Sequence, residues 1–488
     1  MDSWREVVVE RRHPDEHLGL RQRVDELEVL YPLAEGAMFL VAPDARVDPW
    51  LSRTFDSRAW KRLAPSTRHA YIDSLRRFFD FVWLLDERDW FMATEDDYDE
   101  YEELRTDSEK SPVIVQPSTW MKDHSAITWL YTRAYAAGKT QLGPSLPGIR
   151  ATGANFFDGT RVKHTDPSTA RHWRDVGLLG YEWDGVPGEQ VEATQSLRNC
   201  AFFDLLLDSG LRAGEAHSLT VLSRPTIEPG RRMGSSLLQA TQTKGNRPRF
   251  FYFGGSTVSR IDSYVDGPRN TWIAAARRNG LYNRRAGWET ATVLGASHNP
   301  KLVLSSPEGS DRTRLLSQLS VRERAKILIP DGRDWQPLSL WLTSAGLPLK
   351  LASWQSVFHK GNANYLHAAR RAGVAPELQI RVHMHMLRHT FALVKILAYE
   401  RLFDKRFGLT PLQRRDYAEV FGDPYVYVQN LLGHSSPETT KSIYLAALVD
   451  LRHRAVLEHE DYFEADPSVE YAALRQVGQQ TRLVEGLD

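Results

Sequence analysis

The chain has 488 residues, of which 42% are hydrophobic and 10% aromatic, so more than one core is expected, because single cores stop growing near ~250 to 300 residues. Its 62 basic and 62 acidic residues balance, so the overall charge gives no sign of a nucleic-acid partner. The single cysteine, Cys200, excludes an internal disulfide and a cysteine-cluster zinc site.

Hydropathy along the chain indicates no membrane partner. The apolar runs are far shorter than the ~18 to 20 residues that a spanning helix needs. The first ten residues are too polar for a signal sequence. We therefore expect a soluble, cytoplasmic protein.

The sequence pattern of the first 145 residues predicts an accessory segment followed by a helical domain. Residues 1 to 47 mix charges with short apolar runs and indicate an N-terminal arm or accessory segment. Within residues 48 to 145, apolar side chains from Tyr71 to Val82 repeat at helical spacing. A second amphipathic helix is expected from about Ser125 to Ala137, before Gly138. Residues 48 to 145 therefore predict a small all-helical domain.

The remainder predicts a linker and a larger domain. Residues 146 to 184 are rich in Gly, Pro and Asp and indicate an extended linker. Residues 185 to 455 predict a domain that is mainly helical with a small β-sheet. Its strands are expected at Ser236–Thr243 and Arg249–Gly254, with Lys244 in the turn between them.

Local charge is less balanced than the total. Residues 231 to 290 contain eleven Arg or Lys against three acids, so this stretch is suited to neutralising phosphates. Residues 86 to 110 are mainly acidic and are expected to face away from any nucleic acid. Solvated helix surface is the plainer interpretation of both stretches.

Four short motifs follow one another in the second half of the chain. They are Gly210-Leu-Arg212-Ala-Gly-Glu215, Lys244 in its turn, His385-Met-Leu-Arg388-His389, and Leu432-Gly-His434 followed by Tyr444. Each is weak alone, because a His-x-x-Arg pair occurs by chance in many proteins. In this order they resemble the tyrosine site-specific recombinase, or phage integrase, family. The resemblance covers residues 185 to 455 and, more loosely, the helical domain before them.

Phosphodiester cleavage explains why such residue types are needed. Attack by a hydroxyl places growing negative charge on the nonbridging oxygens, and fixed cations stabilise that charge without a metal. The planar, paired donors of Arg212 and Arg388 suit this task. A mobile ammonium in a hairpin turn suits Lys244 for protonating the leaving 5′ oxygen.

The resemblance implies roles for the other motif residues. Tyr444 is the nucleophile that becomes joined to the 3′ phosphate. His385 assists proton transfer from Tyr444, His434 hydrogen-bonds the phosphate, and Glu215 braces the arginines. Strand exchange then passes through a Holliday junction with no cofactor, metal or ATP.

The resemblance also implies a setting for the protein. Double-stranded DNA is the partner, a homotetramer forms on synapsed DNA, and accessory DNA-bending or directionality proteins take part. The fold is a helical core-binding domain, residues 48 to 145, followed by a mixed catalytic domain, residues 185 to 455. Residues 456 to 488 form a C-terminal tail that packs against a neighbouring subunit. The chain's length favours a mobile-element integrase associated with the nucleoid.

Other interpretations remain open. A type IB topoisomerase uses the same phosphotyrosine chemistry, and an inactive DNA-binding regulator would keep the fold without the reaction. His385 and His389 are spaced as a metal pair, but they lack the Glu of His-Glu-x-x-His and an obvious third ligand, so His389 is interpreted as structural. Tyr425 and Tyr427 are alternative nucleophiles, but they precede His434.

The chain departs from the family pattern at three places. Tyr444 lies ten residues after His434, one more than is usual in the family. The distance from Lys244 to His385 is long and predicts an insertion within residues 261 to 340. A second insertion is predicted within residues 395 to 423.

Overall fold

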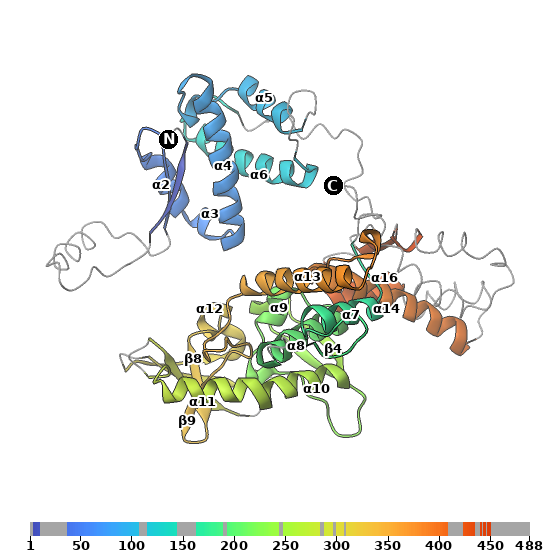
Figure 1. Ribbon diagram of the computed structural model, residues 1–488. Coiled ribbons are helices and arrows are strands. Elements are labelled where there is room, and N and C mark those ends of the chain that lie inside the picture. The colour runs from blue at the N-terminus through green and yellow to red at the C-terminus, as the bar shows by residue number, and fades with distance from the viewer. Residues whose placement is uncertain are drawn as a thin grey trace, which may run out of the picture. The chain divides into compact units, whose positions relative to one another are not determined.

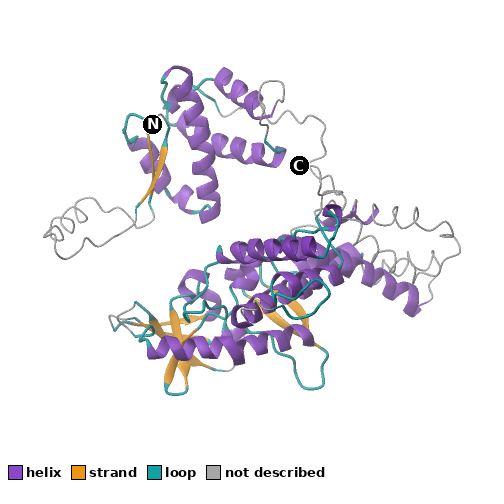
Figure 2. Ribbon diagram, in the orientation of Figure 1, coloured by secondary structure: helices purple, strands orange, loops and turns teal. Residues whose placement is uncertain are grey.

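The structure is a computed structural model. It describes residues 3–9, 37–106, 115–143, 163–188, 193–243, 247–283, 287–295, 299–306, 309–407, 423–434, 440–441, 443–445 and 447–449. The chain divides into two compact units, Met1–Phe156 and Phe157–Asp488. Both are mainly helical with small sheets (Figures 1 and 2), so the predicted fold class is confirmed. In the described part, no helix is both long and apolar enough to cross a membrane.

The first unit is a helical bundle with a two-stranded sheet at its start. Its main elements are β1 (Arg5–Val8), β2 (Met38–Val41), α2 (Pro49–Asp56), α3 (Arg58–Lys61), α4 (Pro65–Asp86), α5 (Glu95–Thr106) and α6 (Pro117–Ala136). The two strands are antiparallel, with Arg5 opposite Val41. Helices α4 and α6 pack against each other and form the centre of this unit.

The helical spacing in the sequence predicted the buried faces of α4 and α6, except that Tyr71, the first residue of the predicted α4 stripe, is only partly buried and Ile72 is buried instead. Because residues three and four apart share one side of a helix, each helix presents one apolar stripe to the core. The buried stripe residues are Ile72, Leu75, Phe78, Phe79 and Val82 on α4, and Ala126, Ile127, Leu130, Tyr131 and Ala134 on α6.

The arm predicted at residues 1 to 47 differs in the structure. Trp4, Met38 and Leu40 are buried in the core of the first unit. Trp4 packs edge-on against Phe79 of α4, with 5.2 Å between the ring centroids. The described ends of this segment therefore belong to the helical unit, because their apolar side chains complete its core. Residues 10 to 36 lie outside the described residues.

The second unit combines helices with two sheets. Its main elements are α7 (Pro167–Gly177), α8 (Ala193–Ser209), α9 (Ala213–His217), β3 (Met233–Leu238), β4 (Arg249–Gly254), α10 (Gly255–Tyr264), η6 (Val265–Arg269), α11 (Asn270–Arg278), β5 (Glu289–Leu294), β6 (Lys301–Ser305), β7 (Asp311–Leu315), α12 (Val321–Arg324), β8 (Ile327–Asp331), β9 (Asp334–Pro337), α13 (Ser353–Arg371), α14 (Met384–Phe407) and α16 (Pro424–Leu432). The apolar helix α8 contacts α7, α10, α14 and β4.

Helix α7 corrects the predicted linker. Residues 167 to 177 form a helix whose first turn is capped by the Asp166 carboxylate, with Pro167 in the first helical position. Trp173 is buried, and its Nε1 donates to Asn362 Oδ1 of α13 at 2.9 Å. The Pro and Asp residues that indicated a linker here are helix-starting residues.

The predicted hairpin is present with altered limits. Strand β3 pairs antiparallel with β4, so that Ser236 lies opposite Phe251. Strand β3 starts before the predicted Ser236, and residues 240 to 242 form a short 3-10 turn in place of its predicted end. Strand β4 has the predicted limits. Lys244 lies outside the described residues.

The first predicted insertion, residues 261 to 340, contains a sheet of its own. Five strands lie in the order β7-β6-β5-β8-β9, and β5 and β8 are parallel. Its apolar side chains form a separate small core that includes Leu302, Leu304 and Ile327. Arg269 links η6 to the end of β9 and the residues that follow it, because its guanidinium donates to the carbonyl oxygens of Pro337, Ser339 and Leu340. Most of the second predicted insertion lies outside the described residues.

Candidate active site

Arg388 connects three of the sequence motifs. It lies in the first turns of α14, and its side chain is only 1% exposed. Its Nη1 donates to the carbonyl oxygen of Gly210 at 2.5 Å, and its Nη2 donates to that of Leu432 at 2.7 Å. Segments that are far apart in the sequence therefore meet at one guanidinium.

The environment of Arg388 suits an anion. Burial, together with the nearby Arg212, lowers the pKa of Arg388 from 12.5 to about 9, against the opposing effects of Glu215 and Tyr444. A guanidinium in this position lacks the solvation that water would give it. An anionic phosphate would place a negative charge beside the Arg388 guanidinium and would therefore be bound strongly by it.

Glu215 holds two arginines at once. It accepts from the backbone N–H of Arg212 at 2.8 Å and from Arg212 Nη1 at 3.0 Å. It also accepts from Arg249 Nη1 and Nη2 at 2.9 and 2.6 Å. Burial raises the pKa of Glu215, but the hydrogen bonds and charges of Arg249 and then Arg212 outweigh burial and lower it. Glu215 is therefore an ionised brace.

Arg249 is a site residue that the sequence motifs did not single out. Besides pairing with Glu215, its Nε donates to the carbonyl oxygen of Leu431 at 3.3 Å. Gly433 lets this arginine approach, because a Cβ there would lie 2.9 Å from Arg249 Cδ. The only sequence signal was its position at the start of a predicted strand within the basic stretch. Three guanidinium groups against one carboxylate leave the cluster with two net positive charges.

Tyr444 lies beside this cluster. Its side chain is 1% exposed and packs with Ile396, Val428 and other apolar residues of α14 and α16. Burial raises the pKa of Tyr444 from 10.0 to about 12, although Arg388 and Arg212 oppose that shift. The phenol is therefore protonated at neutral pH, and a reaction at its oxygen requires a proton acceptor.

Histidines surround Tyr444. Its hydroxyl hydrogen-bonds His389 Nδ1 at 3.0 Å, and its ring lies parallel to that of His434 with 6.3 Å between centroids. His434 Nδ1 in turn bonds Thr440 Oγ1 at 2.9 Å. Burial and nearby arginines, Arg388 first, lower the pKa of His434 to about 4, so its ring is neutral at neutral pH.

His385 lies one ring further away. It is exposed and meets His389 edge-on, with 4.4 Å between their centroids. Burial of part of the ring, Arg388 and Arg212 lower its pKa. The structure thus brings together Arg212, Glu215, His385, Arg388, His434 and Tyr444, whereas Lys244 lies outside the described residues. Among the described residues, no group of three His, Cys, Asp or Glu is arranged to hold a metal ion.

The rival tyrosines lie on α16. Tyr427 stacks on Tyr399 of α14 with 4.9 Å between their ring centroids, and its ring is partly exposed. Tyr425 is at the first turn of α16. Burial, with Tyr252 and Tyr399, raises the pKa of Tyr427, whereas the charges of Arg388 and Arg212 act on the pKa of Tyr444.

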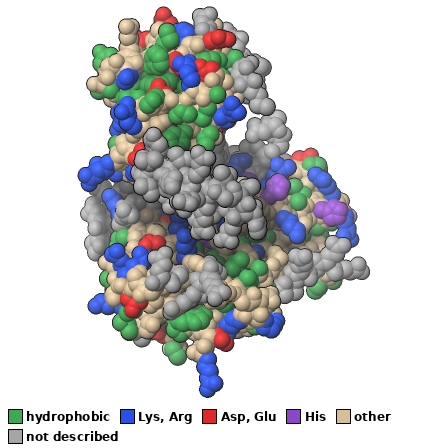
Figure 3. Space-filling view, turned by 90° about the vertical axis from the view of Figure 1, so that its left-hand side faces the viewer, with side chains coloured by type: hydrophobic (Ala, Val, Ile, Leu, Met, Phe, Trp, Pro, Cys, Tyr) green, Lys and Arg blue, Asp and Glu red, His purple; other side chains and the backbone are tan. Residues whose placement is uncertain are grey.

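The basic stretch from 231 to 290 offers fewer free cations than the sequence predicted. Lysine and arginine side chains are spread widely over the face drawn in Figure 3. In this stretch, however, several arginines serve the unit's own structure: Arg249 with Glu215, Arg260 with Asp204, Arg277 with Asp331, and the buried Arg269. Of the described residues in this stretch, four other arginines are exposed and suited to contacting phosphates: Arg231, Arg232, Arg247 and Arg278.

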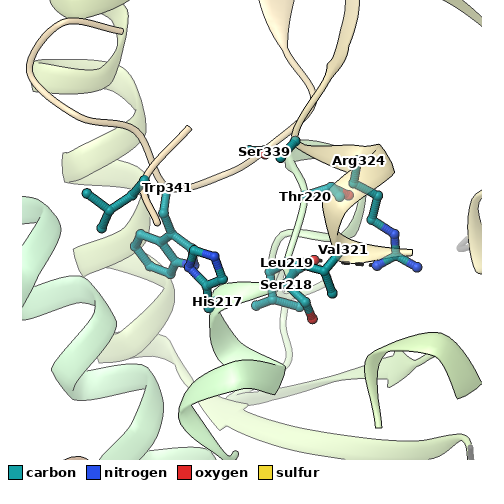
Figure 4. Close-up of a pocket in the computed structure, with 10 residues that line it drawn as sticks. His217, Ser218, Leu219, Thr220, Val321, Arg324, Ser339 and Trp341 are labelled. Carbon is teal, nitrogen blue, oxygen red and sulfur yellow. Dashed lines mark hydrogen bonds between the residues drawn. The ribbon is translucent and has the colours of Figure 1, made fainter. Parts of the chain in front are cut away.

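A small pocket lies at the other end of α9 from Arg212 (Figure 4). Buried Arg324 of α12 lines it and donates to the carbonyl oxygen of Ser218 at 3.4 Å and to that of Leu316 at 3.0 Å. His217, at the end of α9, accepts from Trp354 Nε1 at 3.1 Å. These bonds fix the C-terminal end of the helix that begins at Arg212, so the pocket is interpreted as structural.

Comparisons with known proteins gave structural neighbours only. No family model and no curated protein matches the chain. A crystal structure of XerH site-specific recombinase bound to difH substrate, a pre-cleavage complex, is 16% identical, with 78% of this chain and 74% of that chain covered and a TM-score of 0.39. The post-cleavage XerH complex with palindromic difH substrate is 15% identical, with 80% of each chain covered and a TM-score of 0.42. XerA recombinase is 14% identical, with 83% of this chain and 98% of that chain covered and a TM-score of 0.30. All three neighbours are recombinases.

Proposed function

We propose that this chain is a tyrosine site-specific recombinase that cuts and rejoins double-stranded DNA. The supporting observation is the meeting of Arg212, Arg388 and Tyr444 around one site, with Arg388 bonded to the backbone of both flanking motifs. The order of the motifs along the chain does not by itself require these three side chains to lie close together. A catalytic phosphate site of this family needs it.

The proposed reaction uses the cluster's charge. The scissile phosphate binds Arg212 and Arg388, whose positive charges stabilise the negative charge that grows on its nonbridging oxygens. Tyr444 loses its proton, a transfer in which the family resemblance gives His385 a part. Its oxygen attacks phosphorus and forms the 3′-phosphotyrosyl bond while the bond from phosphorus to the 5′ oxygen breaks, and His434 donates a hydrogen bond to the phosphate. Lys244 protonates the leaving 5′ oxygen. A 5′ hydroxyl from a partner duplex then reverses the attack, and two such rounds pass through a Holliday junction.

A covalent adduct would test this proposal without knowledge of the target sequence. The chain is incubated with a pool of genomic fragments from its source, and protein-linked DNA is recovered under denaturing conditions. Wild type is expected to yield adducts, and Tyr444→Phe is expected to yield none because it lacks the attacking oxygen. Tyr427→Phe is the matched control and should retain the wild-type yield. Equal yields from wild type and Tyr444→Phe would refute the assignment.

Two further assays separate the rival functions. Exchange between two copies of a recovered fragment on one plasmid identifies a recombinase. Relaxation of supercoils without a defined site identifies a topoisomerase. Binding with no adduct identifies an inactive regulator. The proposal also includes three features that the family resemblance implies: a homotetramer on DNA, accessory proteins, and an origin in a mobile element.

A further inference from the structure

We propose that His389 is a catalytic residue and that it is the immediate acceptor of the Tyr444 proton when DNA is cleaved. This inference rests on the proposed function, and it moves to His389 a role that family resemblance gives to His385. It also changes the interpretation of His389 from a structural histidine to a participant in the reaction.

Contact with the reacting oxygen carries the inference. His389 Nδ1 and the Tyr444 hydroxyl are 3.0 Å apart, which is hydrogen-bonding distance. His389 is in α14, and residues 443–445, which include Tyr444, are helical. His385 touches the ring of His389, 4.4 Å away between centroids.

The surroundings keep His389 able to accept a proton. Burial, followed by the charges of His385, Arg388, His164 and His434, lowers its pKa from 6.5 to about 3. The ring is therefore neutral at neutral pH. With Nδ1 accepting from the phenol, the ring's own proton is on Nε2.

Binding of DNA would make His389 a stronger base. An anionic phosphate beside Arg212 and Arg388 offsets the positive charges that disfavour the imidazolium form. The same phosphate offsets the charges that favour ionised Tyr444. Phosphate binding therefore raises the pKa of both groups. His389 becomes a better proton acceptor, and the Tyr444 phenol needs such an acceptor in order to lose its proton.

The step balances without any further reactant. The Tyr444 O–H bond breaks, and the proton passes to His389 Nδ1. The phenolic oxygen forms a bond to phosphorus, and the bond from phosphorus to the 5′ oxygen breaks. That oxygen keeps the electron pair and takes a proton from the general acid. When the strand is rejoined, His389 returns its proton to the departing phenolic oxygen.

Asparagine and glutamine variants would separate proton transfer from packing. An asparagine amide lies near the position of Nδ1 and keeps a hydrogen bond to the phenol, but it cannot hold the proton. The probe is a nicked duplex made from a recovered genomic fragment, with cleavage measured in a single turnover from pH 4 to 9. His389→Asn is compared with His389→Gln, His385→Asn and wild type, and thermal melting shows whether each variant is folded.

The expected result is a loss of rate with a change in pH profile. Wild-type cleavage should fall as the pH drops below the pKa of His389 in the complex, because an imidazolium cannot accept a proton. His389→Asn should be about a hundredfold slower, and its rate should instead rise with pH toward the pKa of the phenol. His385→Asn should keep the acidic limb but move it toward higher pH, because the charge of His385 lowers the pKa of His389.

Other results would overturn the inference. A slow His389→Asn that keeps the wild-type pH profile would mean that His389 only packs. An unchanged His389→Asn beside a His385→Asn that loses the acidic limb would return the role to His385. If wild type forms no adduct with any fragment, the proposed function itself fails, and the inference fails with it.

Discussion

At the scale of single residues, the site depends on how buried charges are paired. Arg249 and Glu215 are almost fully buried and joined by two hydrogen bonds. Removing one partner of such a pair leaves the other as an uncompensated charge. Arg249 therefore positions Glu215, and through it Arg212, without needing to touch DNA.

Arg249→Met is expected to lower the free energy of unfolding at pH 7 by about 3 kcal/mol. The lowered pKa of Glu215 gives the pH dependence. A carboxyl of this kind stabilises the fold above its unfolded pKa of about 4.3, and this stabilisation is lost as pH falls through the lower folded value. The deficit of Arg249→Met should therefore shrink below about pH 4, since protonated Glu215 no longer needs a partner.

Urea unfolding of wild type and Arg249→Met between pH 7 and pH 3.5 would measure this effect. Arg247→Met is the matched control, because Arg247 is exposed, and it should change stability little. A deficit that stays constant with pH would show that Arg249 acts by packing alone.

At the scale of elements, the position of α14 and its motif depends on close contacts between helices. Helices α7 and α13 cross at Gly177 and Gly361, where a Cβ on Gly177 would lie 2.7 Å from the Gly361 carbonyl oxygen. Trp173 of α7 bonds Asn362 of α13, and the same amide oxygen accepts from the backbone of Val382 just before α14. The crossing therefore supports the start of the helix that carries Arg388.

Gly177→Ala is expected to destabilise the second unit by about 1 to 3 kcal/mol, the usual cost of overpacking. Alanine's better helix propensity, about 1 kcal/mol, offsets only part of this. Gly255→Ala, in the first turn of α10, is the control, because a Cβ there meets nothing within 4 Å. Chemical denaturation would compare the two, and equal stability would show that the helices separate without cost.

At the scale of the whole molecule, each unit has its own core. The first unit buries Trp4, Trp60, Trp90 and Trp120 among its helices. Its core forms a cluster separate from those of the second unit. Among the described residues, the core of the first unit contains no side chain of the second, so we expect the first unit to fold by itself.

A fragment of residues 1 to 156 is expected to fold alone. Its thermal unfolding, followed by circular dichroism and tryptophan fluorescence, should be cooperative and coincide for both signals. Leu75→Ala should lower its stability by about 2 to 5 kcal/mol because it leaves a cavity. A fragment without a cooperative transition would mean that the first unit depends on the second.

The sequence predicted the parts of this fold that depend on local patterns. The helical stripe of α4, the strand β4 and the motifs around Arg212 and Arg388 were all recognisable from spacing. The pairing of Arg249 with Glu215 was not, because it joins the start of β4 to α9, which lie 34 residues apart in sequence and meet only in the folded unit. Helix α7 was missed since Asp166 and Pro167 occur both in linkers and at helix starts.

The two acceptors of Arg388 are peptide oxygens, and this affects how the chain can vary. Replacing the side chain at position 432 leaves an oxygen in place for the guanidinium, provided that the local main-chain path survives. Position 210 is stricter, since its φ of 64° and the adjacent Phe391 ring leave no room for a Cβ. Sequence drift around this anchor is therefore limited by main-chain shape more than by chemical identity, which makes distant relatives hard to recognise from residue matches.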